Sequence, residues 1–240
     1  EKVLIYDIVT DVWTFGVDMP EAVFYLEAVA LDDERILLIG GLDQTSLLPI
    51  KNCWIYDTQM EEFEPAVALS SARASGVAVK AGSSVYYAGG SDLTMMGQEE
   101  VFRYDIPTGT WELAGRMPEG RYYDNGVLGD DGLLYMYGGK TGTSTILTDA
   151  GTMRVVDLRD CSFVDVPEPP HAARAGGVIT TDDGRFIFMG GMKGNDPVAN
   201  VFSLKLYSKD AWLGADESAP GEGVRLYAQV DVSLVDYEML

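Results

Sequence analysis

Paired glycines that follow a short apolar run occur four times along this chain, at nearly equal intervals. The intervals between successive pairs are 49, 49 and 52 residues. The pairs are Gly40-Gly41, Gly89-Gly90, Gly138-Gly139 and Gly190-Gly191. A period of about 50 residues is typical of repeat folds, in which one supersecondary unit is stacked on copies of itself.

Two further series of residues run in step with the glycine pairs. The first is a Tyr-Asp pair or its variant, followed six residues after the Asp by a large aromatic residue. Its members are Tyr6-Asp7 with Trp13, Tyr56-Asp57 with Phe63, Tyr104-Asp105 with Trp111, and Val156-Asp157 with Phe163. The second series is an arginine that opens a segment of small residues, at Arg73, Arg121 and Arg174.

The residues between these markers predict β-strands. Runs of four to six β-branched and aromatic residues are bounded by Gly, Asp and Pro, as is typical of strands. Acidic doublets, with or without a glycine, predict tight hairpins because Asp and Gly accept turn conformations. These are Asp32-Asp33, Asp130-Asp131-Gly132 and Asp182-Asp183-Gly184. Since no segment has a sustained helical period, we predict an all-β fold.

On these three series the chain resembles the kelch-repeat family, whose unit is a four-stranded blade. The resemblance covers essentially all 240 residues and implies a kelch-type β-propeller. Some copies depart from the pattern: Val156 replaces the tyrosine, and the fifth copy keeps only Leu204-Lys205-Leu206 before Trp212. We expect about five four-stranded blades in a single domain over 1–240.

The two ends of the chain predict how the ring closes. Residues 1–16 are typical of a third and a fourth strand, and 223–240 of a first and a second strand. A closing blade of two plus two strands would leave no exposed sheet edge. The expected blades are 223–240 with 1–20, then 21–70, 71–119, 120–171 and 172–222. A segment of a longer or multi-propeller chain is the alternative.

Composition limits the classes of partner. The chain has 17 basic and 38 acidic residues, for a net charge of −21, and this charge disfavours nucleic acids while it suits basic partners or cations. No apolar run approaches the roughly 18 residues of a membrane span, so we expect no membrane insertion.

Cys53 and Cys161 fall in blades two positions apart, so both are predicted to be free thiols. Free thiols and the lack of an Asn-X-Ser/Thr acceptor favour a reducing compartment such as the cytoplasm. An extracellular location stays open for a chain whose signal peptide was removed.

Catalytic and metal chemistry has few candidate residues. His171 is the one histidine. The resemblance includes copper oxidases that hold the metal with histidines, and iron-dependent specifier proteins that use a Glu, an Asp and a His. Neither ligand set is present around His171, so we expect no catalytic residues, no metal and no cofactor.

The loops that join second to third strands, and those that join one blade to the next, share one face of a propeller. In kelch relatives that face often binds partners. Here it would carry the 42–52, 91–100 and 140–152 loops, which are apolar and unlike one another. The candidate contact residues are Leu47, Leu48, Ile50, Met95, Met96, Ile146 and Leu147. The alternative is that these side chains fold back onto the blades.

The three arginines should lie where an interblade loop enters the innermost strand. They could bind carboxylates of a partner. We favour a structural role for Arg73, Arg121 and Arg174, because residues repeated in register maintain the stacked unit. The Tyr-Asp pairs are expected to be structural for the same reason.

We therefore predict a non-catalytic protein-binding module or scaffold, whose partner is another protein. One alternative is a carbohydrate-binding or carbohydrate-active propeller that uses Tyr122, Tyr123 and channel-facing acids. Another is a structural subunit of a larger or polymeric assembly, in which the chain binds copies of itself or is joined to additional domains.

Overall fold

The computed structural model describes residues 2–142, 147–167, 173–199, 201–206 and 228–229. Regular structure in these residues consists of β-strands, with no helix among them. This confirms the predicted all-β class. The chain divides into two compact units, Glu1–Tyr122 with Gly142–Ile146 and Tyr123–Thr141 with Leu147–Leu240.

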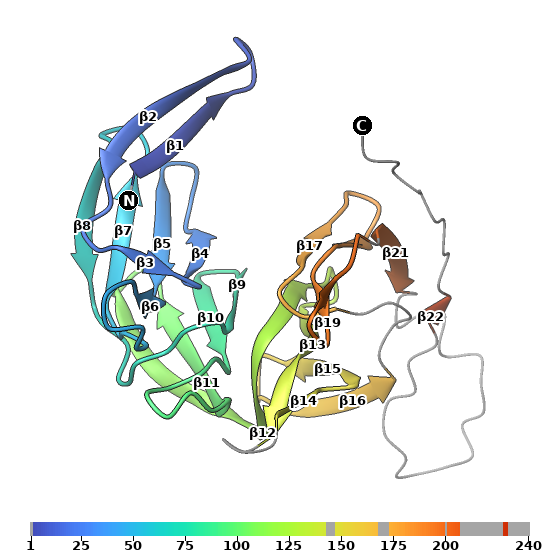
Figure 1. Ribbon diagram of the computed structural model, residues 1–240. Helices are drawn as coiled ribbons and strands as arrows, with labels where there is room; N and C mark the ends of the chain where they lie inside the picture. Colours follow the sequence, from blue (N-terminus) through green and yellow to red (C-terminus); the bar gives the residue numbers. More distant parts are fainter. Residues whose placement is uncertain (1, 143–146, 168–172, 200, 207–227, 230–240) are drawn as a thin grey trace, which may run out of the picture. The chain divides into compact units, whose positions relative to one another are not determined.

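The first unit contains antiparallel sheets with simple up-and-down order (Figure 1). A two-stranded hairpin consists of β1 (Lys2–Asp7) and β2 (Val12–Asp18). The next sheet has the order β4 (Glu27–Ala30), β5 (Arg35–Ile39), β7 (Cys53–Asp57) and β8 (Glu62–Ala66). The one after it has the order β9 (Val77–Ala81), β10 (Ser84–Ala88), β11 (Gln98–Asp105) and β12 (Thr110–Leu128).

The second unit repeats this order of strands. One sheet continues from β12 through β13 (Leu133–Gly142) and β15 (Thr152–Asp157) to β16 (Phe163–Pro167), with β14 (Leu147–Asp149) beside β13. The other has the order β17 (Gly177–Thr180), β18 (Arg185–Met189), β21 (Val201–Leu206) and β22 (Ala228–Gln229). Short two-stranded pairings are β3 (Val23–Phe24) with β6 (Leu42–Asp43), and β19 (Met192–Lys193) with β20 (Asp196–Pro197).

Strand β12 differs from the expectation of a break near residue 119. It runs for 19 residues and neighbours both β11 and β13. Its first part, Thr110 to Arg121, pairs with β11 and shifts register twice. The extended backbone persists because Pro118 and the glycines at 115 and 120 bend a strand without requiring a turn.

Each hydrophobic core lies between two neighbouring sheets of one unit. In the first unit, Leu37 and Ile39 of β5 belong to the same buried cluster as Val85 and Tyr87 of β10. In the second unit, the rings of Tyr137 and Phe188 meet edge to face, with centroids 4.3 Å apart. Because successive side chains of a strand point to opposite faces, alternate residues of a strand, such as Leu37 and Ile39, enter the same core.

The Tyr-Asp and aromatic series form directly opposed pairs across a hairpin. Tyr6 faces Trp13, Tyr56 faces Phe63 and Tyr104 faces Trp111, with ring centroids 4.9, 4.7 and 5.0 Å apart. The Asp after each tyrosine accepts hydrogen bonds from backbone N–H groups of the turn, as Asp57 does from residues 59 and 60 at 2.8 Å. These pairs therefore stabilise the hairpin, which fits the structural role expected for the Tyr-Asp pairs.

The paired glycines allow one blade-like sheet to approach the backbone that enters the next. All eight have positive φ. The N–H of Gly41 donates to the Arg73 carbonyl, and that of Gly90 to the Arg121 carbonyl, both at 2.8 Å. A Cβ on Gly89 would lie 2.6 Å from the same Arg121 oxygen. Glycine is needed here because the backbone has a positive φ and because there is no room for a Cβ atom.

The C-terminal pairing differs in part from the prediction. Ala228–Gln229 is the outer strand next to β21, whereas 223–240 was expected to supply the first and second strands of a closing blade. Most of 223–240 lies outside the described residues. The closing blade and the blade ranges stay predictions.

Two glycines with nearly the same φ allow the cost of a left-handed backbone to be measured separately from the cost of a steric overlap. Gly40 has φ +57 and a Cβ there would overlap the Arg73 carbonyl oxygen, whereas Gly82 has φ +59 and nothing within 4 Å. We expect Gly82→Ala to cost about 1 kcal/mol of unfolding free energy for its left-handed backbone. Gly40→Ala should cost at least about 3 kcal/mol, because backbone must move. Equal losses in denaturant unfolding would contradict this account.

Glu27 is an acidic residue at the start of the inner strand β4, and most of its surface is covered by protein. Burial raises the pKa of its carboxyl from 4.5 to about 8, although the N–H of Ala78 on the next sheet opposes the shift. The folded protein therefore holds a proton on Glu27 over a pH range in which the unfolded chain has released it.

Because of Glu27, the free energy of unfolding should fall as pH rises from about 4.5 to 8. The slope of this fall should be at most about 1.4 kcal/mol per pH unit. Glu27→Gln removes that slope, so its melting temperature should exceed that of the wild type at pH 8 and match it near pH 4. The exposed turn residue Glu34 provides the control variant Glu34→Gln. A Glu27→Gln difference that does not change with pH would refute the raised pKa.

Candidate functional site

The loops and the interblade segments leave each sheet at the same end, which we call the loop end. In the first unit, β5 ends at Ile39 and β7 begins at Cys53, so 40–52 lies at this end. Segment 67–76 leaves β8 there too, since antiparallel strands alternate in direction. The loops after β6 and β10 emerge on the lower side of this unit in Figure 1.

Arg73 and Arg121 support the scaffold at the loop end. Both side chains are buried. Nη2 of Arg73 donates to the Glu100 carboxylate at 2.9 Å, and the exposed Arg116 donates to the other oxygen at 2.8 Å. Burial opposes ionisation of Glu100, but its own N–H and the charges of Arg73 and Arg116 lower its pKa. The structural interpretation of Arg73 therefore fits its contacts.

Arg174 does not belong to the same register as the other two arginines. The carbonyl that faces Gly138 is that of Ala173, so Ala173 takes the position of Arg73 and Arg121. Arg174 forms an antiparallel bridge with Met192, as Ala74 does with Ser91. The prediction that all three arginines repeat one position is wrong, because the interval from Arg121 to Arg174 is one residue longer than the backbone register, which runs from Arg121 to Ala173.

A fourth repeated position is not evident from residue type. Tyr25, Ser75, Tyr123 and Ala175 have φ of 55, 56, 59 and 52°, and their intervals match those of the Tyr-Asp series. Within each unit a hydrogen bond links two of them: the Ser75 N–H donates to the Tyr25 carbonyl at 2.9 Å, and the Ala175 N–H to the Tyr123 carbonyl at 3.0 Å. Only the constant offset from each Asp could have identified this position.

The two tyrosines proposed for sugar binding have different environments. Tyr122 is buried, and Tyr123 is partly exposed at the left-handed position. Since a sugar stacks on an accessible ring face, Tyr122 offers none in the folded unit.

The 42–52 loop is a fixed turn with apolar residues at its tip. The Asp43 carboxylate accepts from the Ser46 N–H at 2.7 Å, and the Leu47 N–H donates to the Asp43 carbonyl at 2.9 Å. Leu47 has φ 56° and a 58% exposed side chain, and Leu48 is also exposed. Ile50 is half-buried, and its backbone bonds to Gly41 and Arg73. The loop thus presents two leucines.

The 91–97 segment has the same design in the next sheet. The Asp92 carboxylate accepts from the Thr94 N–H at 2.8 Å, and Met95, at φ 59°, donates to the Asp92 carbonyl at 2.8 Å. Met95 is exposed, whereas Met96 is half-buried. Leu93, which sequence reasoning missed, is 61% exposed. Leu93 could have been predicted as a contact residue, because it is apolar and lies in the same predicted loop as Met95 and Met96.

The third predicted loop adds little to this comparison. Ile146 lies outside the described residues. Leu147 begins β14, and the exposure of its side chain is not described. The structure therefore brings predicted contact residues to the loop end in two neighbouring sheets of the first unit.

The thiols are free and buried, as predicted. Burial raises the pKa of Cys53 to about 11 and, to a lesser degree, that of Cys161, so neither thiol is activated as a nucleophile. In the part of the chain that the structure describes, no three His, Cys, Asp or Glu side chains could hold a metal ion. No helix long and apolar enough to cross a membrane occurs there either.

Sequence comparison finds kelch-repeat relatives, although no family model matches the chain. It is 31% identical over 125 residues to the F-box/kelch-repeat protein SKIP20 of Arabidopsis thaliana, covering 49% of this chain and 30% of that protein. It is 27% identical over 236 residues to the Kelch-like protein terF of Aspergillus terreus, covering 91% of this chain and 50% of that protein. The chain thus spans half or less of these relatives' lengths.

Fold comparison agrees with the sequence relatives. The solved structure of YjhT, a kelch-type β-propeller, has a TM-score of 0.72 and 13% identity, covering 85% of this chain and 72% of that chain. At this identity the likeness concerns the fold alone, and it leaves the number of blades a prediction. Repeats, sheets and relatives together give this chain the fold of a kelch-type β-propeller and are consistent with the kelch-repeat family.

Proposed function

We propose that this propeller is a non-catalytic protein-binding module that uses the loop end of its first unit. The contact surface consists of the exposed side chains of Leu47, Leu48, Leu93 and Met95, and we call it the loop-tip surface. The kelch-repeat relatives favour a protein-interaction role in general. The loop-tip surface is the specific part of the proposal.

The backbone at two of these residues carries the argument. Leu47 and Met95 have positive φ, a conformation that costs a side chain other than glycine about 1 kcal/mol or more. A turn alone would be served better by Gly or Asn. Both loops instead hold a large apolar side chain in water at that position, which is a reason to look for a partner.

The loop-tip surface is also rigidly presented. Asp43 and Asp92 fix the two turns through their carboxylates, and the sheets beneath share one buried core. Apolar residues held in place before binding lose little conformational entropy when a partner covers them. Such residues are effective anchors of a protein interface.

Leu48→Asp together with Met95→Asp tests the surface. A carboxylate desolvated in an interface is costly, so the double variant should bind the partner at least about tenfold more weakly. The partner is first captured from the source cells by the wild-type chain and identified by mass spectrometry. Its affinity for each variant is then measured with the purified proteins. Unchanged affinity would refute the proposal.

Met60→Asp is the matched control. Met60 is 67% exposed in the turn after β7, at the opposite end of the same sheet. This variant should bind like the wild type. Both variants should keep the melting temperature, because surface substitutions usually change stability by no more than about 0.5 kcal/mol. A large drop for the double variant would mean that these residues are part of the scaffold.

A further inference from the structure

Arg174 is a charged residue at a position where the other repeats have an uncharged one. Its structural counterparts are Ala74, which makes the same bridge, and Phe24, which pairs with Leu42 after the first glycine pair. Tyr122 takes the position in the third copy by the spacing of the left-handed residues. A guanidinium here is therefore not part of the repeated stacking, and its presence needs a separate explanation.

The Arg174 side chain is buried, and one guanidinium nitrogen lacks a hydrogen bond among the residues that the structure describes. The residue is 8% exposed, and its Nη1 atom has no acceptor within the described residues. The nearest charge is Oδ1 of Asp149 at 3.6 Å, which is too long for a hydrogen bond. A charged donor removed from water without an acceptor is costly, so the position favours an anionic ligand.

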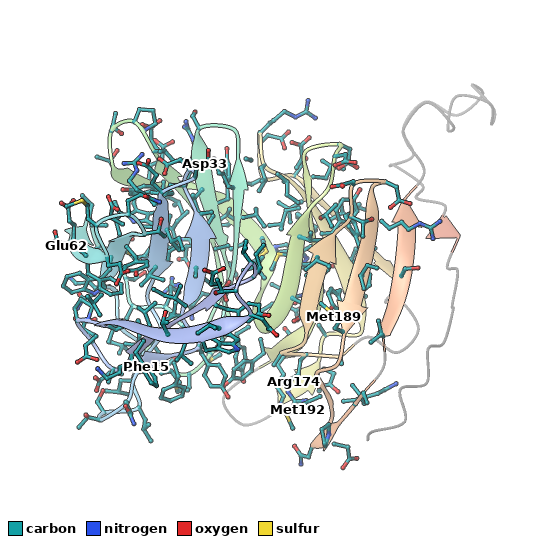
Figure 2. The ribbon with its side chains drawn as sticks, turned by 90° about the horizontal axis from the view of Figure 1, so that it is seen from above. Phe15, Asp33, Glu62, Arg174, Met189 and Met192 are labelled. Carbon is teal, nitrogen blue, oxygen red and sulfur yellow. The ribbon has the colours of Figure 1, made fainter. Side chains whose placement is uncertain are left out.

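Asp149 shows how a carboxylate approaches this guanidinium. It lies on β14 and is half exposed, and its Oδ2 accepts from the Gly194 N–H at 3.4 Å. Figure 2 shows Arg174 beside Met192, which precedes Gly194 in the same hairpin. Both contacts of Asp149 are long, so this carboxylate is held loosely and could be displaced.

The segments around Arg174 carry charges of both signs, since Asp196 pairs with Lys193 and the Asp124 carboxylate lies against Gly139. Lys140 directly follows the glycine pair within β13, and Lys193 belongs to β19 next to the bridge with Arg174. The Ala150 N–H donates to the Gly139 carbonyl at 3.2 Å, and the Gly194 N–H donates to the Asp149 carboxylate at 3.4 Å. Arg174 and the two lysines thus lie on segments that also carry Asp124, Asp149 and Asp196, and the guanidinium is buried among them with one nitrogen that has no hydrogen-bond partner in the described part of the chain.

We propose that Arg174 binds a carboxylate from outside this chain. This carboxylate would displace that of Asp149, which now lies 3.6 Å from the guanidinium. We assign it to an acidic side chain of a partner protein, a source that rests on the proposed protein-binding function. Guanidinium and carboxylate match in geometry and form charge-assisted hydrogen bonds.

The test titrates the full chain with the peptide acetyl-Gly-Glu-Glu-Gly-amide at about 0.15 M salt, where long-range repulsion is screened. The Nε–H signal of Arg174 is followed by NMR and identified by its loss in Arg174→Lys. The peptide should shift this signal, and the matched Gln-Gln peptide should not. Arg174→Gln should weaken peptide binding at least about tenfold, and Asp149→Asn should strengthen it several-fold.

Stability separates binding from a scaffold role. Arg174→Gln should keep the melting temperature, whereas Arg73→Gln should lower it, since Arg73 is paired with Glu100. Equal shifts by both peptides, full binding by Arg174→Gln, or weaker binding by Asp149→Asn would overturn the proposal. Binding of glucuronate but not of the Glu peptide would overturn the assignment to a protein side chain.

The outcome is independent of the loop-tip surface. The double variant Leu48→Asp and Met95→Asp should bind the Glu peptide like the wild type. If that variant keeps its partner while Arg174→Gln loses the peptide, the loop-tip proposal fails and the Arg174 proposal holds.

Discussion

Backbone-to-backbone hydrogen bonds between a glycine pair and the segment that enters the next sheet are the interaction on which this fold depends. The N–H of the second glycine reaches a carbonyl that only a residue without a side chain can approach so closely. The two buried clusters then form around facing strands whose spacing this contact helps to set. A short sequence signal thus determines a large part of the architecture, because it occurs where two repeats meet.

The fold was largely predictable for that reason. Paired glycines, acidic hairpins and the tyrosine–aromatic pairs all act through local backbone geometry, which residue type reveals directly. Strand β12 was not predicted, since nothing in 110–128 distinguishes a bent strand from a strand, a loop and a second strand. Ala228–Gln229 also differed, because one short strand pattern fits an inner or an outer strand equally well.

The candidate site was predictable only in part. Choosing loops by their apolar content found Leu47, Leu48 and Met95, but whether a side chain points outward depends on the turn, and so Met96 and Ile50 proved half-buried. Arg174 was misassigned because an arginine one residue out of register looks like a member of the series. Backbone bridges, which no single sequence displays, separate it from Arg73 and Arg121.

The continuity of β12 affects how the repeats unfold. One strand neighbours both β11 and β13, so the strands of two successive repeats belong to one continuous sheet. In an array whose repeats meet only at side-chain interfaces, an end unit can fray while the rest stays folded. Here the continuous strand β12 pairs with a strand of each repeat. Unfolding one repeat therefore removes a neighbouring strand from the other repeat. We therefore expect the amide protons of this sheet to exchange as a single cooperative unit.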